Sequence, residues 1–194
     1  MTKLDPSVQS VKAIMILPRR EFSSECPLPE GYTYEAYDDS MKDAWCRLHT
    51  STGLFSCQEE AADILQKMIE EDRSAFEKQF VFVCDANKNL VASCGLWKGN
   101  HFGMERVRLH YVSVLEEHQH QKIGQSMIVH AARMYDAMPS KYPLYVVSQA
   151  SSYGAIKLYS RLGFTPYLGV YQDHTKEQSE KDWEYITDVL RKKA

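Results

Sequence analysis

The segment that decides the predicted fold is Val112-Ser113-Val114-Leu115-Glu116-Glu117-His118-Gln119-His120-Gln121-Lys122-Ile123-Gly124. Residues 106–114 alternate in a way that predicts a strand, and the polar residues after them predict a loop. Beyond residue 124 the apolar residues repeat at the spacing of one helical face: Met127, Ile128, Ala131, Met134 and Tyr135. The free N–H groups at the start of such a helix suit a bound anion, such as a diphosphate.

A second informative segment is Ala155-Ile156-Lys157-Leu158-Tyr159-Ser160-Arg161-Leu162-Gly163-Phe164. It predicts a short helix that ends at Gly163, because glycine is the preferred residue just after a helix. Tyr159 falls on the apolar stripe of this helix, together with Ala155 and Leu158. Taken alone, such a tyrosine is most simply a packed core residue.

The two segments together resemble the signature segments of the GNAT superfamily of acyl-CoA-dependent N-acetyltransferases. Its phosphate-binding motif is Gln/Arg-x-x-Gly-x-Gly/Ala, which Gln119 and Gly124 match at its ends, with Lys122 in place of the first glycine. An alignment shifted to residues 121–126 keeps that glycine but puts Glu116 where the strand supplies a valine, so we prefer the unshifted one. The family's second segment is Asn-x-x-Ala-x-x-Leu-Tyr-x-x-x-Gly-Phe, and this chain matches it with Ser152, Ala155, Leu158, Tyr159, Gly163 and Phe164.

The resemblance implies an α+β fold: a mixed, mostly antiparallel sheet with two splayed parallel strands, flanked by helices. The expected order is a strand near residues 31–37, two helices, a hairpin over 80–97 and the strand over 106–114. A helix, a strand over 143–148, a helix, a strand within 164–171 and a C-terminal helix follow. We place the domain at residues 30–194 and treat residues 1–29 as an N-terminal extension with an extra strand over 11–17.

The resemblance also implies a site for acetyl-CoA as co-substrate. Val112 and Val114 would pair through their backbone with the pantetheine arm, and a backbone N–H near Val114 would stabilise the oxyanion. Tyr159 would be the general acid that protonates the departing thiolate. The remaining residues expected to bind the cofactor surround the helix start or replace the family asparagine: Gln119, His120, Gln121, Lys122, Ile123, Gly124, Gln125 and Ser152.

The sequence offers several candidates for the general base and for the acceptor pocket. His110 lies on the strand that approaches the thioester and has a side chain suited to proton relay. Glu105, Glu117 and a water molecule are competing bases. Residues 52–55, with Trp97 and Tyr111, are candidates to line the acceptor pocket, although aromatic residues also fill cores.

Composition limits the class of protein. The net charge is −3, which argues against a nucleic-acid partner and slightly favours cationic amines. The five scattered cysteines suggest reduced thiols and a cytoplasmic protein, and no apolar run is long enough for a membrane span. His118 and His120 lack the accompanying ligands of a recognised metal site, so we expect no metal.

The sequence therefore predicts an N-acetyltransferase that transfers an acetyl group from acetyl-CoA to a primary amine of a small molecule or a peptide. A homodimer is a family-level expectation. The alternative is a catalytically silent acyl-CoA-binding regulatory module. A nucleotide-binding enzyme ranks last, because the chain lacks both Gly-x-Gly-x-x-Gly and the Walker motif.

Overall fold

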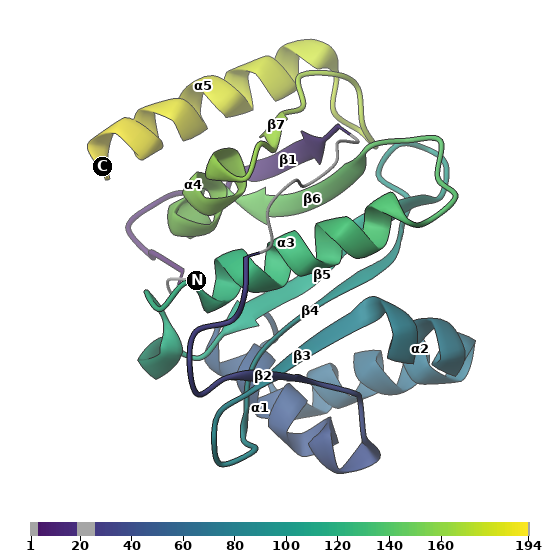
Figure 1. Ribbon diagram of the computed structural model, residues 1–194. Coiled ribbons are helices and arrows are strands. Elements are labelled where there is room, and N and C mark those ends of the chain that lie inside the picture. The colour runs from purple at the N-terminus through teal and green to yellow at the C-terminus, as the bar shows by residue number, and fades with distance from the viewer. Residues whose placement is uncertain (1–3, 19–25, 194) are drawn as a thin grey trace.

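The computed structural model describes residues 4–18 and 26–193. Its seven strands form one sheet in the order β2-β3-β4-β5-β6-β1-β7 (Figure 1). Among the described strands, β5 and β6 pair in parallel and every other pair is antiparallel, which confirms the predicted fold class. The strands are β1 (Lys12–Leu17), β2 (Thr33–Glu35), β3 (Phe80–Cys84), β4 (Leu90–Gly99), β5 (Arg106–Val114), β6 (Leu144–Gln149) and β7 (Thr165–Pro166).

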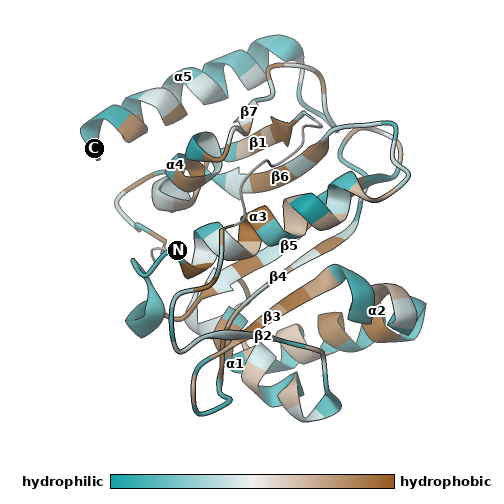
Figure 2. Cartoon of the chain, viewed as in Figure 1, coloured by the Kyte–Doolittle hydropathy of each residue, from teal (hydrophilic) through white to brown (hydrophobic). Residues whose placement is uncertain are grey.

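Helices cover both faces of the sheet (Figure 1). On one face, called the α1 face, α1 (Lys42–Ser51) and α2 (Gln58–Gln79) enclose a cluster rich in aromatic residues. On the opposite α3 face, α3 (Ile123–Asp136), α4 (Tyr153–Arg161) and α5 (Lys176–Lys192) enclose the larger apolar cluster. Figure 2 shows that hydrophobic residues are frequent in the strands, whereas the helices mix hydrophobic and hydrophilic residues.

The strand from the N-terminal segment lies inside the sheet. β1 pairs with β6 from Lys12↔Gln149 to Leu17↔Leu144, and its other edge pairs with β7. Ala13 and Met15 are fully buried in the cluster of the α3 face, while Ile14 packs with Tyr145 on the other face. Both faces of β1 are therefore covered, as expected for an interior strand.

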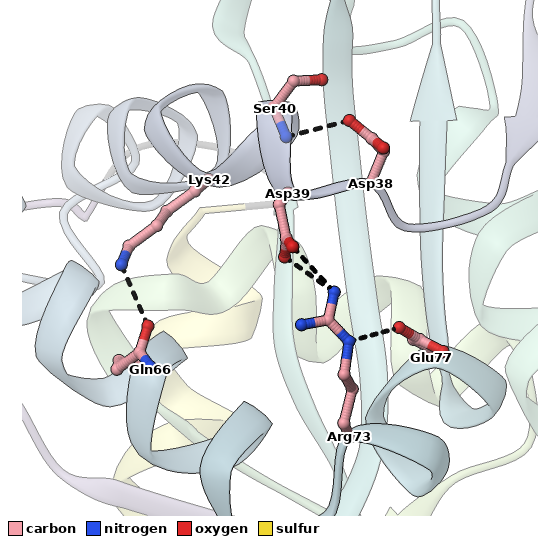
Figure 3. A network of polar contacts seen from close by, with 7 residues as sticks. All are labelled: Asp38, Asp39, Ser40, Lys42, Gln66, Arg73 and Glu77. Carbon is pink, nitrogen blue, oxygen red and sulfur yellow. Dashed lines mark hydrogen bonds and ion pairs between the residues drawn. The ribbon is translucent and has the colours of Figure 1, made fainter.

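A polar network joins the start of α1 to α2 (Figure 3). The Arg73 guanidinium donates to both carboxylate oxygens of Asp39 at 2.9 Å and to Glu77 at 2.8 Å. Helix α2 is kinked at Asp72, whose carboxylate accepts from the Ala75 N–H at 2.9 Å and so caps the second half of the helix. Exposed ion pairs of this kind contribute little to the free energy of folding, and this network links the turn before α1 to α2.

The end of the domain differs from expectation in one respect. The strand predicted within residues 164–171 is reduced to the two residues of β7, and just beyond it the Tyr167 N–H donates to the Ile14 carbonyl at 3.0 Å. Helix α5 is present where the spacing of Trp183, Ile186 and Leu190 predicts it. Across residues 4–18 and 26–193, no helix is long and apolar enough to cross a membrane.

Candidate active site

A β-bulge in β5 shapes the centre of the sheet. Ser113 pairs with Ser93 and His110 with Gly95, so β5 carries one more residue than β4 between these two pairs. Tyr111, within the bulge, has a left-handed φ of 51°, which is a strained conformation for a bulky residue. The simple alternation predicted for residues 106–114 is therefore wrong beyond His110: Leu109, Val112 and Val114 share the α3 face.

The bulge lies at the point where β5 and β6 stop pairing. Their parallel pairing consists of Arg108↔Tyr145 and Leu109↔Val146 and extends no further along the described strands. Past these pairs lies a cavity of about 460 Å³, called the central cavity here. The lining on the α3 face includes Leu109, Val112, Val146, Ala155 and Tyr159. The lining on the α1 face includes Thr52, Arg108, Tyr111, Ser113 and Val147. The cavity is thus bounded by residues of both faces of the sheet.

Tyr159, the predicted general acid, lines the central cavity from α4. Only 2% of its surface is exposed, and its ring lies 5.5 Å from that of Phe164. Burial raises the pKa of its hydroxyl well above 10, an effect that the positive charge of Arg108 partly offsets. The side chain is therefore a neutral hydroxyl at physiological pH and a possible proton donor.

His110, the predicted base, is also at the central cavity. Its Nε2 donates to the Lys98 carbonyl at 3.2 Å, which assigns the proton to that nitrogen and leaves Nδ1 as the basic atom. Burial, together with the charge of Arg108, lowers the pKa of His110 well below 6.5. The ring is therefore neutral at pH 7 and a weaker base than an exposed histidine.

A buried hydrogen-bond chain that the sequence analysis missed leads from the cavity into the core. Thr52 Oγ1 lies 3.0 Å from Ser113 Oγ, which lies 2.9 Å from His49 Nδ1, and His49 Nε2 lies 2.9 Å from Ser93 Oγ. Thr52 and Ser113 line the cavity, whereas His49 is fully buried. Burial lowers the pKa of His49 to about 3. No local motif could reveal this chain, because its members come from three separate elements.

A second concavity, called the α3 groove here, lies at the start of α3. Lys122 is the N-terminal flanking residue of the helix and has a left-handed φ of 67°, the conformation that a glycine adopts most easily. The groove is lined by Val114, by residues of the predicted loop and by α4, whose Lys157 and Arg161 add positive charge that the sequence analysis overlooked. Their spacing of four residues on a short helix was the available signal.

The predicted cofactor-binding residues divide between these two sites. Val112 and Ser152 line the central cavity, while Val114, Gln119, His120, Lys122, Ile123, Gly124 and Gln125 line the α3 groove. The Gln119 side chain donates to the Val114 carbonyl at 3.0 Å, closing the loop onto β5. Gln121 is turned away from the groove: its side-chain oxygen accepts from the Tyr32 hydroxyl at 3.0 Å.

The alternative candidates for the general base and for the acceptor pocket occupy several different places in the structure. Glu105 and Trp97 border a different cavity near the start of β5, and Glu117 is exposed in the short helix after β5. Phe55 packs against Trp45 and Tyr111, although Thr52, Gly53 and Leu54 do line the central cavity. Within residues 4–18 and 26–193, no group of three or more His, Cys, Asp or Glu side chains could hold a metal ion.

The buried His49 makes stability depend on pH. Its pKa is about 3 in the folded protein and about 6.5 when unfolded, so the unfolded state binds more protons between these values. We therefore expect the free energy of unfolding to fall by up to about 1.4 kcal/mol per pH unit for this histidine as pH drops from 6 to 4. Urea unfolding across this range measures the slope. A His49→Gln variant should be less stable at pH 7.5 but show a shallower slope; an equal slope would contradict the assignment.

Comparisons with known proteins agree with this geometry. A family model described as an acetyltransferase (GNAT) domain matches residues 77–166, from the end of α2 to β7. No curated protein matches the chain.

Several solved structures share the fold. A GCN5-related N-acetyltransferase from Sphaerobacter thermophilus is 15% identical with a TM-score of 0.56, over 81% of this chain and 49% of that one. A tandem GNAT protein from the clavulanic acid biosynthesis pathway is 12% identical with a TM-score of 0.56, over 81% and 50%. A Trypanosoma brucei acetyltransferase is 16% identical with a TM-score of 0.52, over 74% and 99%. The match thus spans about half the length of the first two proteins. Residues 77–166 of this chain thus match the GNAT acetyltransferase domain model, and the chain shares the fold of these solved structures.

Proposed function

We propose that the protein transfers an acetyl group from acetyl-CoA to a primary amine. The observation that carries the proposal is the central cavity, formed where β5 and β6 stop pairing, with the buried side chain of Tyr159 among its lining residues. GNAT proteins in general use acyl-CoA in this way, which supports the reaction class. The acceptor and the catalytic roles below are our own inference.

The α3 groove suits the diphosphate of CoA. The N–H groups of the first helical turn lack partners within the helix and carry its partial positive charge. Lys122, Lys157 and Arg161 surround this helix start, and no carboxylate is among the described residues that line the groove. From there the pantetheine arm would run along Val114 and Val112 toward the central cavity, pairing with the β5 edge that β6 leaves free.

Within the central cavity the amine nitrogen would attack the thioester carbonyl carbon, and the carbon–sulfur bond would then break. The departing thiolate would take the proton of the Tyr159 hydroxyl, which burial keeps protonated. A backbone N–H near Val114 would donate to the oxygen that becomes negative. After the attack the nitrogen loses a proton as the amide forms, and this proton would restore the Tyr159 hydroxyl group. Before the attack the amine must lose another proton, because the neutral form alone is nucleophilic.

His110 Nδ1 is our candidate for receiving that proton, directly or through water. The Lys98 carbonyl fixes the tautomer that leaves Nδ1 basic. The position of the ring at the cavity supports the role over Glu105 and Glu117, neither of which lines the cavity.

Ligand binding tests the proposed reaction class first. Acetyl-CoA and CoA should stabilise the protein against heat, whereas ATP and NAD should not. A ligand at about 100 times its dissociation constant adds about 2.7 kcal/mol to the free energy of unfolding, which a thermal-shift measurement detects readily. Lys122→Gln should weaken CoA binding about two- to fivefold through the lost charge, while the exposed Lys67→Gln serves as the matched control. Stabilisation by ATP or NAD alone would refute the proposal, and CoA binding without turnover would support a silent binding module.

Replacing Tyr159 with phenylalanine tests the general acid. The ring and its packing remain, so acetyl-CoA affinity should be unchanged, but the rate of CoA thiol release with a good acceptor should fall at least about tenfold. Steady-state kinetics and a separate binding titration distinguish these effects. Unchanged turnover would remove Tyr159 from the mechanism.

The pH profile tests His110. Because burial lowers the pKa of this histidine, kcat/KM should not fall with His110 protonation until the pH is well below 6.5. His110→Gln should abolish this acidic limb and lower kcat, with the melting temperature recorded to detect loss of structure. An acidic limb at 6.5 or above that remains after correction for the ionisation of the acceptor amine, or an identical profile in the variant, would contradict the role.

A further inference from the structure

Arg108 is a partly buried cation that lines the central cavity and has no anionic partner among the described residues. Its Nε atom is inaccessible to solvent and has no hydrogen-bond partner, and no ion pair to the guanidinium occurs among the described residues. Burial lowers the pKa of this group, and the titratable groups with which it interacts are three tyrosines and two histidines, none of them a carboxylate: Tyr111, Tyr145, Tyr159, His101 and His110. A buried charge without a counter-charge is costly, so a bound anion would stabilise this arrangement.

The charged residues that line the central cavity are all cations among the described residues. Lys12 also lines the cavity, and no aspartate or glutamate is among the described lining residues. The Lys12 ammonium group donates to Gln172 at 3.2 Å and has no carboxylate partner in the described chain. This local charge is opposite to the net charge of −3, so the preference for cationic acceptors suggested by composition does not hold at the cavity.

CoA does not supply the missing anion in the proposed binding mode. The α3 groove, where its diphosphate would lie, shares no lining residue with the central cavity. Arg108 belongs to the α1 face of the sheet, together with Tyr111 and Tyr145, and so lies across the sheet from that groove. The anion is therefore expected on the molecule that enters from the α1 face.

We propose that the acceptor is an amine that also carries a carboxylate, such as an amino acid, and that Arg108 binds this carboxylate. The inference rests on the proposed acetyl transfer and names its substrate class. The planar guanidinium presents paired donors that match a carboxylate, and a single buried positive charge balances a monoanion. Lys12 would add a second, more peripheral charge. Binding through the carboxylate would also hold the amine near Tyr159, whose titration Arg108 influences.

The test compares matched acceptors that differ only in the carboxylate. Amino acids, the corresponding amino-acid amides and the corresponding phosphonates are assayed for CoA release with the 194-residue protein. In parallel, N-acetylated amino acids and their amides are titrated into the CoA complex, which measures binding without requiring turnover. We expect kcat/KM and affinity to be at least about tenfold higher for the carboxylates than for the amides.

The variant Arg108→Gln should lower kcat/KM for the carboxylate acceptor about 100-fold and leave the amide within about threefold, removing the preference. Arg108→Lys should retain part of the preference for the carboxylate acceptor. Arg106→Gln is the matched control, because the Arg106 guanidinium stacks on Phe102 and Tyr142 and borders a different cavity. Melting temperatures and acetyl-CoA affinity are measured for each variant.

The outcomes separate the two proposals. A carboxylate preference that Arg108→Gln removes would support the inference. Equal or better use of amides, a preference for phosphonates, or a carboxylate preference that survives in Arg108→Gln would overturn it while leaving acetyl transfer intact. If acetyl-CoA does not bind to the wild-type protein, the proposed function itself fails, and the inference fails with it.

Discussion

The bulge in β5 is the constraint on which the rest of the site depends. An extra residue bends a strand and strengthens its twist, and here it lies directly after the last parallel pair with β6. The strain at Tyr111 is tolerated because its ring packs with Trp45 and Phe55 and the surrounding strands fix its backbone. Without the bulge, β5 would keep pairing with β6, and the central cavity would close.

The parting of the strands creates a site with two distinct sides. On the α3 face, a helix start and several cations form a groove that we propose for the diphosphate of CoA. On the α1 face, Arg108 and Tyr111 border the same central cavity, with Thr52 and Ser113 beside them. The two substrates would therefore approach from opposite faces of the sheet and meet beside Tyr159. In the proposed binding mode, this separation would keep the negative charges of the acyl donor and of an anionic acceptor apart.

The sequence predicted the features encoded by local patterns. The hairpin of β3 and β4, helix α3 and the short helix ending before Gly163 all follow from periodicity and turn residues. Lys122 was predicted in part. The motif comparison places this residue at a glycine position, but only the structure shows that its φ is positive. The bulge escaped prediction because residues 106–114 alternate plausibly without it. The insertion of β1 between β6 and β7, the His49 chain and the unpaired Arg108 depend on contacts between distant segments, which no local pattern records.

Amide hydrogen exchange, followed by NMR with and without acetyl-CoA, measures most directly whether the parted strands receive the acyl donor. If the pantetheine arm pairs with the free edge of β5, exchange at the backbone amides between residues 111 and 114 should slow on binding. The amides at the start of α3 should slow as well. Protection confined to another part of the molecule, with β5 unchanged, would contradict the account.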